Sequence, residues 1–339
     1  MWGAAFEDTV KMWRSLVLTI LIFVFSYVYY MEMDLYIITV ITYLIGWFSR
    51  DLFYESSTSS NVYVGGYREL DHKVLNLKRT ETPWMNLGKW DEAKGKKKTY
   101  AEACRDLARA VGDAAELNKG VVLDVGFGRG AQLLMWSQEY GVRDICGVNI
   151  SKAEVEHAKR LVNTSTCTTK SRFDLRVGDA TNLPWKEKHF DRVLAMDCAY
   201  HFVTRENFFR EARRVLRQDG KLVLADMVLK SKPQGIVQNL LIRVICFMSG
   251  IPRENLLTTD EYVSSLERNH FSNVKVLETF DVGSGFLNFM KRHEKEWGDV
   301  VRSDRMGSLR HAAWFISKCP IEMCVVRANV ADSPFAVRT

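Results

Sequence analysis

The stretch Val121–Ala131, which reads VVLDVGFGRGA, decides the fold of this chain. Its first five residues are mostly Val and Leu and predict a short buried strand. Three glycines, Gly126, Gly128 and Gly130, follow at every second position. Glycine permits a tight turn and close approach of a ligand, and the next helix would point its N-terminus at that ligand. The stretch therefore predicts a strand–loop–helix unit that binds a small molecule at the end of the strand.

The chain around this stretch alternates between strand-like and helix-like segments. Short apolar runs predict strands at 145–150, 173–177, 192–196 and 221–225. Amphipathic or apolar-striped segments predict helices at 100–116, 132–140, 151–162 and 205–217. The alternation predicts an α/β fold with a parallel sheet, helices on both faces and right-handed crossovers.

Two local signals predict where these elements begin and end. Ser151 is a suitable N-cap, and Glu154 three residues later would complete a reciprocal capping box. Asp219 and Gly220 predict a turn between the helix at 205–217 and the next strand.

The composition is that of an ordinary globular protein. The chain has 339 residues, of which 47% are hydrophobic and 26% charged, and its formal net charge is +6. These values exclude a disordered chain, and without a basic stripe they do not support nucleic-acid binding. Seven scattered cysteines with no CxxC pair indicate a reducing compartment, and the dispersed histidines do not indicate a zinc site.

The N-terminal region carries two long apolar segments. Ser15–Met31 has 17 uncharged residues and Leu35–Ser49 has 15, so as helices they would be about 25 and 22 Å long, against about 30 Å for a bilayer core. A signal peptide, a hairpin buried in a soluble core and a membrane hairpin are the three interpretations. The membrane hairpin is favoured because both segments are apolar on all faces and no cleavage site follows the first. Lys11, Arg14 and Arg50 would then face the cytosol, whether the hairpin spans the bilayer or enters one leaflet.

The glycine loop by itself fits two kinds of cofactor. Gly126, Gly128 and Ala131 satisfy the dinucleotide pattern GxGxxG/A, but the same loop could bind the adenosyl group of S-adenosylmethionine. Three features favour the second cofactor. Asp124 stands two residues before the first glycine, where a carboxylate can meet an ammonium group. Asn149 rather than an acidic residue ends the next strand, and no Tyr is followed by Lys four positions later.

Five motifs occur in a fixed order: VLDVGFGRG, GVNIS, VGDATNLPW, FDRVLAMDCAYHF and RVLRQDGKLVLADM. In order and spacing they resemble class I S-adenosylmethionine-dependent methyltransferases, in the branch that includes sterol, tocopherol, quinone and phosphoethanolamine methyltransferases. The upstream stretch NLGKWDEAKGKKKTYAEAC resembles lipid-acting members of that branch. The resemblance covers residues 85–230 and implies a Rossmann-like sheet that strands at 273–279 and 321–330 complete.

The resemblance implies these cofactor-binding residues: Asp124, Gly126, Gly128, Gly130, Gln132, Asn149, Asp179 and Ala180. The glycines would cradle S-adenosylmethionine, and Asp124 would face its amino-acid end. Asn149 takes the ribose position, which is usually acidic in the family, although an amide can accept from one hydroxyl and donate to another. Asp179 would accept from the adenine amino group, next to a backbone contact from Ala180. Gln132 and Trp185 would line the pocket.

The candidate catalytic residues lie in the motif Asp197–Phe202, after the fourth predicted strand. A protic acceptor must lose a proton during methyl transfer, which requires a base. His201 is the first candidate for that base or for orienting the acceptor, as in similar phosphobase methyltransferases, and Tyr200 is the second. The alternatives are a structural histidine that holds its loop and a tyrosine buried by packing.

An alkene acceptor would need different chemistry. Methylation at carbon produces a cation, and Trp84, Trp90, Tyr200 and Phe202 offer aromatic faces that could stabilise it. The long aromatic signature of sterol methyltransferases is not evident, so carbon methylation is one option among several.

The motifs and the apolar segments together predict a membrane-anchored enzyme. Residues 1–53 would form the anchoring hairpin, 54–99 a linker and lid segment, and 100–339 the methyltransferase domain. Within this domain, 236–251 is a further apolar stretch that would form a cap or a membrane-surface helix. We expect methyl transfer from S-adenosylmethionine to a lipophilic small molecule, either a sterol, a prenyl or quinone-type compound, or a lipid amine. We expect the membrane to be that of the endoplasmic reticulum, with the catalytic domain facing the cytosol.

Two other functions are compatible with the sequence. A NAD(P)-dependent oxidoreductase of a lipid substrate would use the glycine loop for a dinucleotide, and a non-catalytic membrane scaffold would keep the fold without the reaction. The sequence predicts neither a metal nor a nucleic-acid partner, and it does not identify a protein partner.

Overall fold

A computed structural model describes part of the chain. The described residues are 84–90, 97–118, 120–165, 171–235, 238–239, 242–243, 246, 250–297, 317 and 320–331. The chain divides into two compact units, Met1–Val62 and Tyr63–Thr339, and all described residues belong to the second. The predicted apolar helices at 15–31 and 35–49 therefore lie outside the described residues. Within the described ranges, no helix has the length and apolar character needed to span a bilayer.

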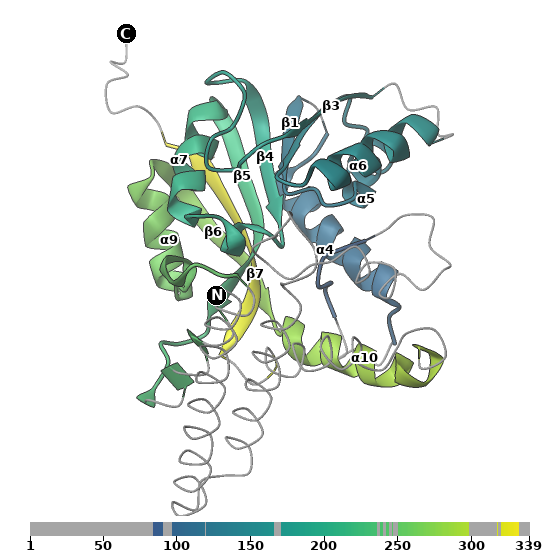
Figure 1. Cartoon of the computed structure of the whole chain (residues 1–339). Helices are drawn as coiled ribbons and strands as arrows, with labels where there is room; N and C mark the ends of the chain where they lie inside the picture. The colour runs from purple at the N-terminus through teal and green to yellow at the C-terminus, as the bar shows by residue number, and fades with distance from the viewer. Residues whose placement is uncertain are drawn as a thin grey trace, which may run out of the picture. The chain divides into compact units, whose positions relative to one another are not determined.

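The second unit is built on a seven-stranded sheet with the order β3-β2-β1-β4-β5-β7-β6 (Figure 1). The strands are β1 (Val121–Val125), β2 (Asp144–Asn149), β3 (Arg172–Val177), β4 (Phe190–Met196), β5 (Leu216–Leu229), β6 (Phe271–Phe280) and β7 (Ile321–Val330). The strands β1 to β5 pair with one another in parallel. β7 pairs antiparallel with both β5 and β6. All the predicted strands are present, and the predicted Rossmann-like sheet is confirmed.

The helices cover both faces of the sheet, as predicted. They are α4 (Tyr100–Ala115), α5 (Ala131–Gln138), α6 (Lys152–Thr164), α7 (Arg205–Val215), α9 (Thr259–Arg268) and α10 (Val282–Trp297), with short 3-10 turns η2 (Ala199–His201) and η3 (Arg253–Asn255). In Figure 1, α4, α5 and α6 lie on one face of the sheet, and α7 and α9 lie on the other. This arrangement leaves the ends of the strands as the open edge of the domain.

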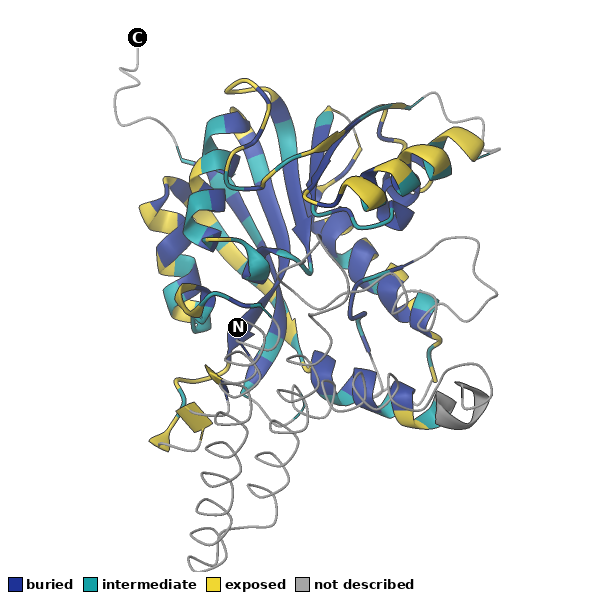
Figure 2. Ribbon diagram, viewed as in Figure 1, coloured by how far each residue is buried: buried dark blue, intermediate teal, exposed yellow. Residues whose placement is uncertain are grey.

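Burial explains why the strands can be recognised in the sequence. Val122 and Leu123 of β1 and residues 222–225 of β5 have no exposed surface, and Figure 2 shows the central strands as buried. A strand covered by helices on both faces reads as a nearly continuous apolar run. β6 lies at an edge of the sheet and instead tends to alternate between half-buried and exposed residues.

Two predicted local signals differ from the structure. The Ser151 hydroxyl does accept from the Glu154 N–H at 3.3 Å, but the reciprocal half of the capping box is absent. The reason is that the Ser151 N–H donates to Asn149 Oδ1 at 3.0 Å, so the Glu154 carboxylate accepts from the Asn149 amide instead. The turn predicted at 219–220 lies within β5, where the register shifts and four residues oppose one residue of β4.

Candidate active site

A cavity of about 280 Å³ lies at the carboxyl ends of β1, β2, β3 and β4. In open α/β sheets, ligands bind at this edge where the strand order reverses, which here is between β1 and β4. We divide the lining of the cavity by the chain segments that supply it. The segments after β1, β2 and β3, termed the glycine-loop end, supply Gly126, Gly128, Gln132, Asn149, Ile150, Glu154, Asp179 and Ala180. The segment before α4, together with the end of β4 and the loop after it, is termed the β4-loop end and supplies Met85, Asn86, Met196, Asp197, Cys198, His201, Phe202 and Val203.

The three glycines after β1 all have positive φ but serve different purposes. Gly126 and Gly128 line the cavity, with φ of +74° and +54°. A Cβ at Gly126 would lie 2.6 Å from Cys198 Sγ, so the backbone there must pass close to the loop after β4. Gly130 is not among the lining residues, and a Cβ there would lie 2.8 Å from Ala158 of α6. Gly130 therefore allows α5 and α6 to pack closely, and its predicted cofactor contact is not supported by its position.

The predicted carboxylate of Asp124 is fully buried at the end of β1. Gln132 Nε2 donates to its two oxygens at 3.1 and 3.2 Å, and Trp136 Nε1 donates at 2.6 Å. Burial raises the pKa of Asp124 to about 7, although these donors oppose the shift. Gln132 lines the cavity and Asp124 does not, so the carboxylate reaches the ligand side through the Gln132 amide.

Asn149 lies at the end of β2 and is hydrogen-bonded to Glu154, which the sequence suggested only as part of a helix cap. Its Nδ2 donates to Glu154 Oε2 at 2.8 Å, and Glu154 also lines the cavity. Burial raises the pKa of Glu154, which the Asn149 hydrogen bond partly opposes. The family usually has an acidic residue at the position of Asn149, and its absence here could have directed attention to Glu154. Glu154 lies in the first turn of α6, lines the same cavity and places its carboxylate beside Asn149.

Both residues predicted to contact the adenine lie at the cavity, whereas Trp185, predicted only to line the pocket, does not. Asp179 and Ala180 line the cavity, and Asp179 Oδ1 accepts from the Thr181 N–H and hydroxyl, both at 2.8 Å. Trp185 is not a lining residue, so that prediction is wrong. Its Nε1 donates to Asp174 at 3.3 Å and the Arg176 guanidinium lies 4.8 Å from its ring, which holds the indole in the core beneath β3.

Asp197 is the acidic residue of the β4-loop end, and the sequence analysis did not single it out. It follows β4 with a φ of +57°. Oδ2 accepts from the Leu87 N–H at 2.6 Å, and Oδ1 accepts from the Tyr200 hydroxyl at 2.8 Å. Burial raises its pKa to about 7. The contact with Leu87 joins the loop after β4 to a segment 110 residues earlier.

His201 lines the cavity, as predicted for a residue that meets the acceptor. Its Nδ1 lies 3.4 Å from the Gly250 carbonyl oxygen, which makes Nδ1 the protonated nitrogen and leaves Nε2 as an acceptor. Burial lowers the pKa of His201 to about 4, so the ring is neutral near pH 7. Tyr200 packs against it with ring centroids 4.3 Å apart, but Tyr200 is buried and does not line the cavity.

The aromatic residues considered for a cationic intermediate are mostly directed elsewhere. Of Trp84, Trp90, Tyr200 and Phe202, only Phe202 lines the cavity. Trp90 stacks on Phe289 of α10 at 5.0 Å. A cage of these four rings around an acceptor is therefore not formed.

The described residues of the apolar stretch 236–251 show one buried helical face. Ile242 and Cys246, four residues apart, are buried, whereas Gln238 and Arg243 are exposed. This spacing is typical of a helix that packs one side on the domain.

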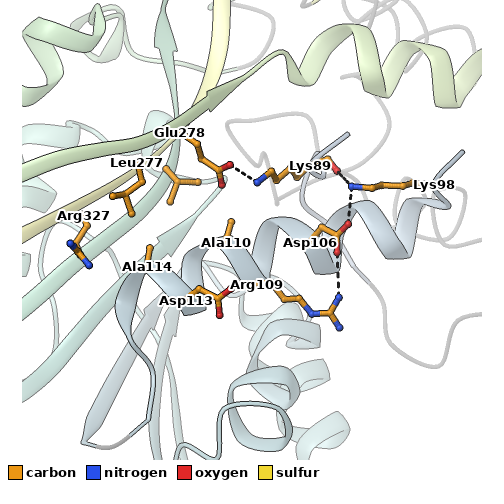
Figure 3. A pocket seen from close by; sticks show the side chains of 11 residues that line it. Lys89, Lys98, Asp106, Arg109, Ala110, Asp113, Ala114, Leu277, Glu278 and Arg327 are labelled. Atoms are coloured by element: carbon orange, nitrogen blue, oxygen red, sulfur yellow. Dashed lines mark hydrogen bonds and ion pairs between the residues drawn. The ribbon is translucent and has the colours of Figure 1, made fainter. Parts of the chain in front are cut away.

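A second, wider cavity of about 570 Å³ lies between α4 and the strands β6 and β7 (Figure 3). Its charged side chains neutralise one another. Lys98 pairs with Asp106 at 2.8 Å, Arg109 pairs with the same carboxylate at 3.3 Å, and Lys89 pairs with Glu278. It contains none of the predicted site residues, so we assign the active site to the cavity at the strand ends.

Comparison with known proteins agrees with this assignment. The family model described as "Methyltransferase domain" matches residues 123–224, which run from β1 into β5. The chain is 31% identical over 224 residues to erythromycin 3''-O-methyltransferase of Saccharopolyspora erythraea, covering 62% of this chain and 68% of that protein. It is 29% identical over 161 residues to norajmaline N-methyltransferase of Rauvolfia serpentina, covering 41% and 54%.

Solved structures show the same fold at low identity. A sarcosine dimethylglycine methyltransferase from Galdieria sulphuraria aligns with a TM-score of 0.60 at 16% identity, over 73% of this chain and 93% of that one. A mycolic acid cyclopropane synthase complexed with SAH aligns with a TM-score of 0.61 at 17% identity, over 78% and 96%. The glycine loop at Gly126 and Gly128 lines a cavity at the strand ends. The match to the methyltransferase family model and to a methyltransferase that is 31% identical decides between the possible cofactors. The chain therefore belongs to the S-adenosylmethionine-dependent methyltransferases.

Proposed function

We propose that this enzyme methylates a lipophilic small molecule that enters the β4-loop end of the cavity and carries a hydroxyl or amine as its nucleophile. The observation that carries the proposal is that Asp197 and His201, two half-buried proton acceptors, line the same end of the cavity as apolar side chains. Met85, Phe202 and Val203 line the same end. An apolar pocket with a few convergent polar groups is typical of a site for an apolar ligand that must be oriented.

The glycine-loop end is suited to S-adenosylmethionine, which supplies an already activated methyl group when it is bound. The protein then has to position the two reactants and exclude water. We assign the cradle to the backbone at Gly126 and Gly128, the amino-acid end to the Gln132 amide, and the ribose corner to Glu154 with Asn149. We retain Asp179 for the adenine.

Removal of the acceptor's proton is the task of the β4-loop end. A general base works best when its pKa is near the working pH, and the pKa of about 7 at Asp197 meets this condition. The neutral His201 has a pKa of about 4 and is a weaker base, but its Nε2 can accept a hydrogen bond from the acceptor. We therefore assign proton removal to Asp197 and orientation of the nucleophile to His201.

We further propose that the apolar segments at 15–31 and 35–49 hold the enzyme on a membrane, with its catalytic domain in the cytosol and the endoplasmic reticulum as the compartment. The apolar acceptor would then be supplied from the same membrane. Fractionation with carbonate washing and protease protection of the cytosolic face test this placement. Release of the full chain by carbonate would contradict the anchor.

The acceptor class can be tested by label transfer. Purified full chain, with a mild detergent, is incubated with S-adenosylmethionine carrying a deuterated methyl group and with a total lipid extract. Mass spectrometry should find the label in an organic-soluble product, and a Gly128→Arg variant should give none. A label that enters only water-soluble products would overturn the lipophilic acceptor while leaving the methyltransferase assignment intact.

A further inference from the structure

Residues 250–255, which follow the apolar stretch at 236–251, hold the loop that carries His201. Asn255 lies in η3 and is only 2% exposed. Its Nδ2 donates to the carbonyl oxygens of Tyr200 at 2.9 Å and of Phe202 at 2.8 Å, the two residues that flank His201. A single side chain therefore holds the backbone on both sides of the histidine.

The other half of the Asn255 side chain is also engaged. Its Oδ1 accepts from the Arg205 N–H at 2.9 Å, at the first residue of α7. The orientation of the amide is therefore set by its partners, because only the nitrogen can donate to the two carbonyls and only the oxygen can accept from Arg205. The loop from His201 to the start of α7 is fixed at three points by one residue.

The same segment contacts the imidazole itself. The Gly250 carbonyl oxygen lies 3.4 Å from His201 Nδ1, five residues before Asn255. This contact selects the tautomer with Nε2 as the acceptor, while Asn255 sets the position of the backbone that carries the ring. Both contacts come from a segment outside the strand ends that the sequence motifs mark.

A buried ion pair supports the loop from below. Arg205 Nε lies 3.1 Å from Asp226 Oδ2, and the Tyr262 hydroxyl donates to the same oxygen at 2.9 Å. The Tyr200 backbone N–H also interacts with Asp226 and opposes the rise of its pKa with burial. Asp226 thus holds the backbone N–H of Tyr200, and Asn255 holds its carbonyl oxygen.

We propose that Asn255 is a positioning residue that aims His201 into the β4-loop end of the cavity. The proposal rests on the acceptor-orienting role assigned to His201 above. It extends the functional machinery to a segment more than fifty residues away, which no motif in the sequence marks.

Asn255→Asp is the sharpest substitution because it keeps the size of the side chain. One oxygen can still accept from the Arg205 N–H, but the other faces the two carbonyl oxygens that the amide previously bonded. We expect the loop to move and water to reach the imidazole. The charged or titratable groups facing this loop are Asp197 and Tyr200 within it, Asp226 from β5, Arg205 from α7 and Tyr262 from α9. The low pKa of His201 itself is caused by burial, opposed by the Gly250 carbonyl.

The readout is the pKa of His201, measured by NMR on the full chain with ring-labelled histidine and assigned with a His201→Asn variant. In Asn255→Asp, the His201 pKa should rise from about 4 by about one unit or more toward the ordinary value of about 6.5. The affinity for S-adenosylhomocysteine should stay within about threefold by calorimetry, since no glycine-loop residue changes. Turnover should fall about tenfold or more, but less than about twofold in a His201→Ala background.

Asn269→Asp is the matched control. Asn269 is also a buried asparagine, and its Nδ2 donates to the Ser265 carbonyl at 2.7 Å, but it does not contact the His201 loop. It should leave the His201 pKa unchanged. An unchanged His201 pKa in folded Asn255→Asp, or the same shift in both variants, would overturn the proposal. The added carboxylate of Asn255→Asp would raise the His201 pKa by its charge alone. The uncharged Asn255→Ser must therefore also raise this pKa, and a rise confined to Asn255→Asp would overturn the proposal. If Asn255→Asp does not fold, Asn255→Ser is judged by the same criteria.

Failure of the proposed function would look different. Wild-type protein that does not bind S-adenosylhomocysteine, or that keeps full turnover after His201→Ala, would refute the functional assignment. Neither result depends on what Asn255 does to the His201 pKa.

Discussion

The glycine-loop end and the β4-loop end of one cavity are built in different ways. The glycine-loop end comes from three consecutive strands and their loops, between Gly126 and Ala180. The β4-loop end is assembled across long separations: Leu87 reaches Asp197 over 110 residues, and Asn255 reaches Phe202 over 53. The cofactor side is thus a local motif, whereas the acceptor side depends on tertiary contacts. Substitutions should therefore separate cofactor binding from turnover.

The largest expected effect is at the glycine loop. Gly128→Arg places a long side chain in the cavity at a residue with φ of +54°, and should weaken S-adenosylhomocysteine binding by about a thousandfold or more. Calorimetry on the full chain measures this. The control is Gly141→Arg, because Gly141 also has positive φ but open space around it. Equal binding in the Gly128 variant and the wild type would remove the loop from the cofactor site.

The next largest effect is expected for His201→Ala, which should lower turnover without weakening cofactor binding. Because the ring lies at the β4-loop end and makes no hydrogen bond to glycine-loop residues in the described part of the chain, turnover should fall about 10²- to 10⁴-fold. The affinity for S-adenosylhomocysteine should change little. The assay is label transfer to the organic-soluble product that the lipid-extract experiment is expected to find. A matching loss of cofactor affinity would show that the two ends are not separable.

Glu154→Ala tests whether Glu154 contributes to cofactor binding at the glycine-loop end. It removes a half-buried carboxylate that lines the cavity and accepts from Asn149, so S-adenosylhomocysteine affinity should fall about tenfold. Turnover at saturating cofactor should be retained. Glu156→Ala is the control, since Glu156 lies on the same helix and faces solvent toward Lys152. If both variants bind like the wild type, Asn149 alone serves the ribose corner.

A further expected effect concerns stability and not binding: a pH dependence of unfolding at Asp124. Burial raises its pKa to about 7, so between about pH 4 and pH 7 the folded protein holds a proton that the unfolded chain has released. Stability contributed by this group is therefore present at low pH and is lost as the pH rises through about 7, by at most about 1.4 kcal/mol per pH unit. Asp124→Asn should flatten the curve of unfolding free energy against pH by this share. Parallel curves for the two proteins would contradict the raised pKa.

Most of the fold, and much of the cavity lining at its glycine-loop end, could be predicted from the sequence. The central strands were found because the sheet is covered on both faces, so each of them is an apolar run between turn signals. β6, at an edge of the sheet, tends instead to alternate between half-buried and exposed residues. Gly126, Gly128, Gln132, Asn149, Asp179 and Ala180 all line the cavity, as expected from the motifs. These residues follow directly from strand ends, and parallel strands bring their carboxyl ends to one edge.

The errors have a common physical origin. Trp185 was assigned to the pocket because of its position in a motif, but an ion pair between Arg176 and Asp174 on β3 draws its indole into the core. Glu154 was treated as part of a capping box, and its choice of Asn149 over the Ser151 N–H depends on which donor was left unbonded. Which of several nearby donors a carboxylate accepts from depends on the exact positions of these groups, and the sequence does not give those positions.

By itself, the sequence determined the α/β architecture and the position of the glycine loop, and it favoured S-adenosylmethionine over a dinucleotide as the cofactor. These depend on hydrophobic periodicity and on residues close together in the chain, where spacing dictates position. Only the tertiary structure decided that Asp124 acts through Gln132, that Asp197 is a half-buried acid held by Leu87, and that Asn255 holds both neighbours of His201. Packing segments distant in sequence excludes water from these groups, and this desolvation, rather than residue type, sets the pKa values that the chemistry requires.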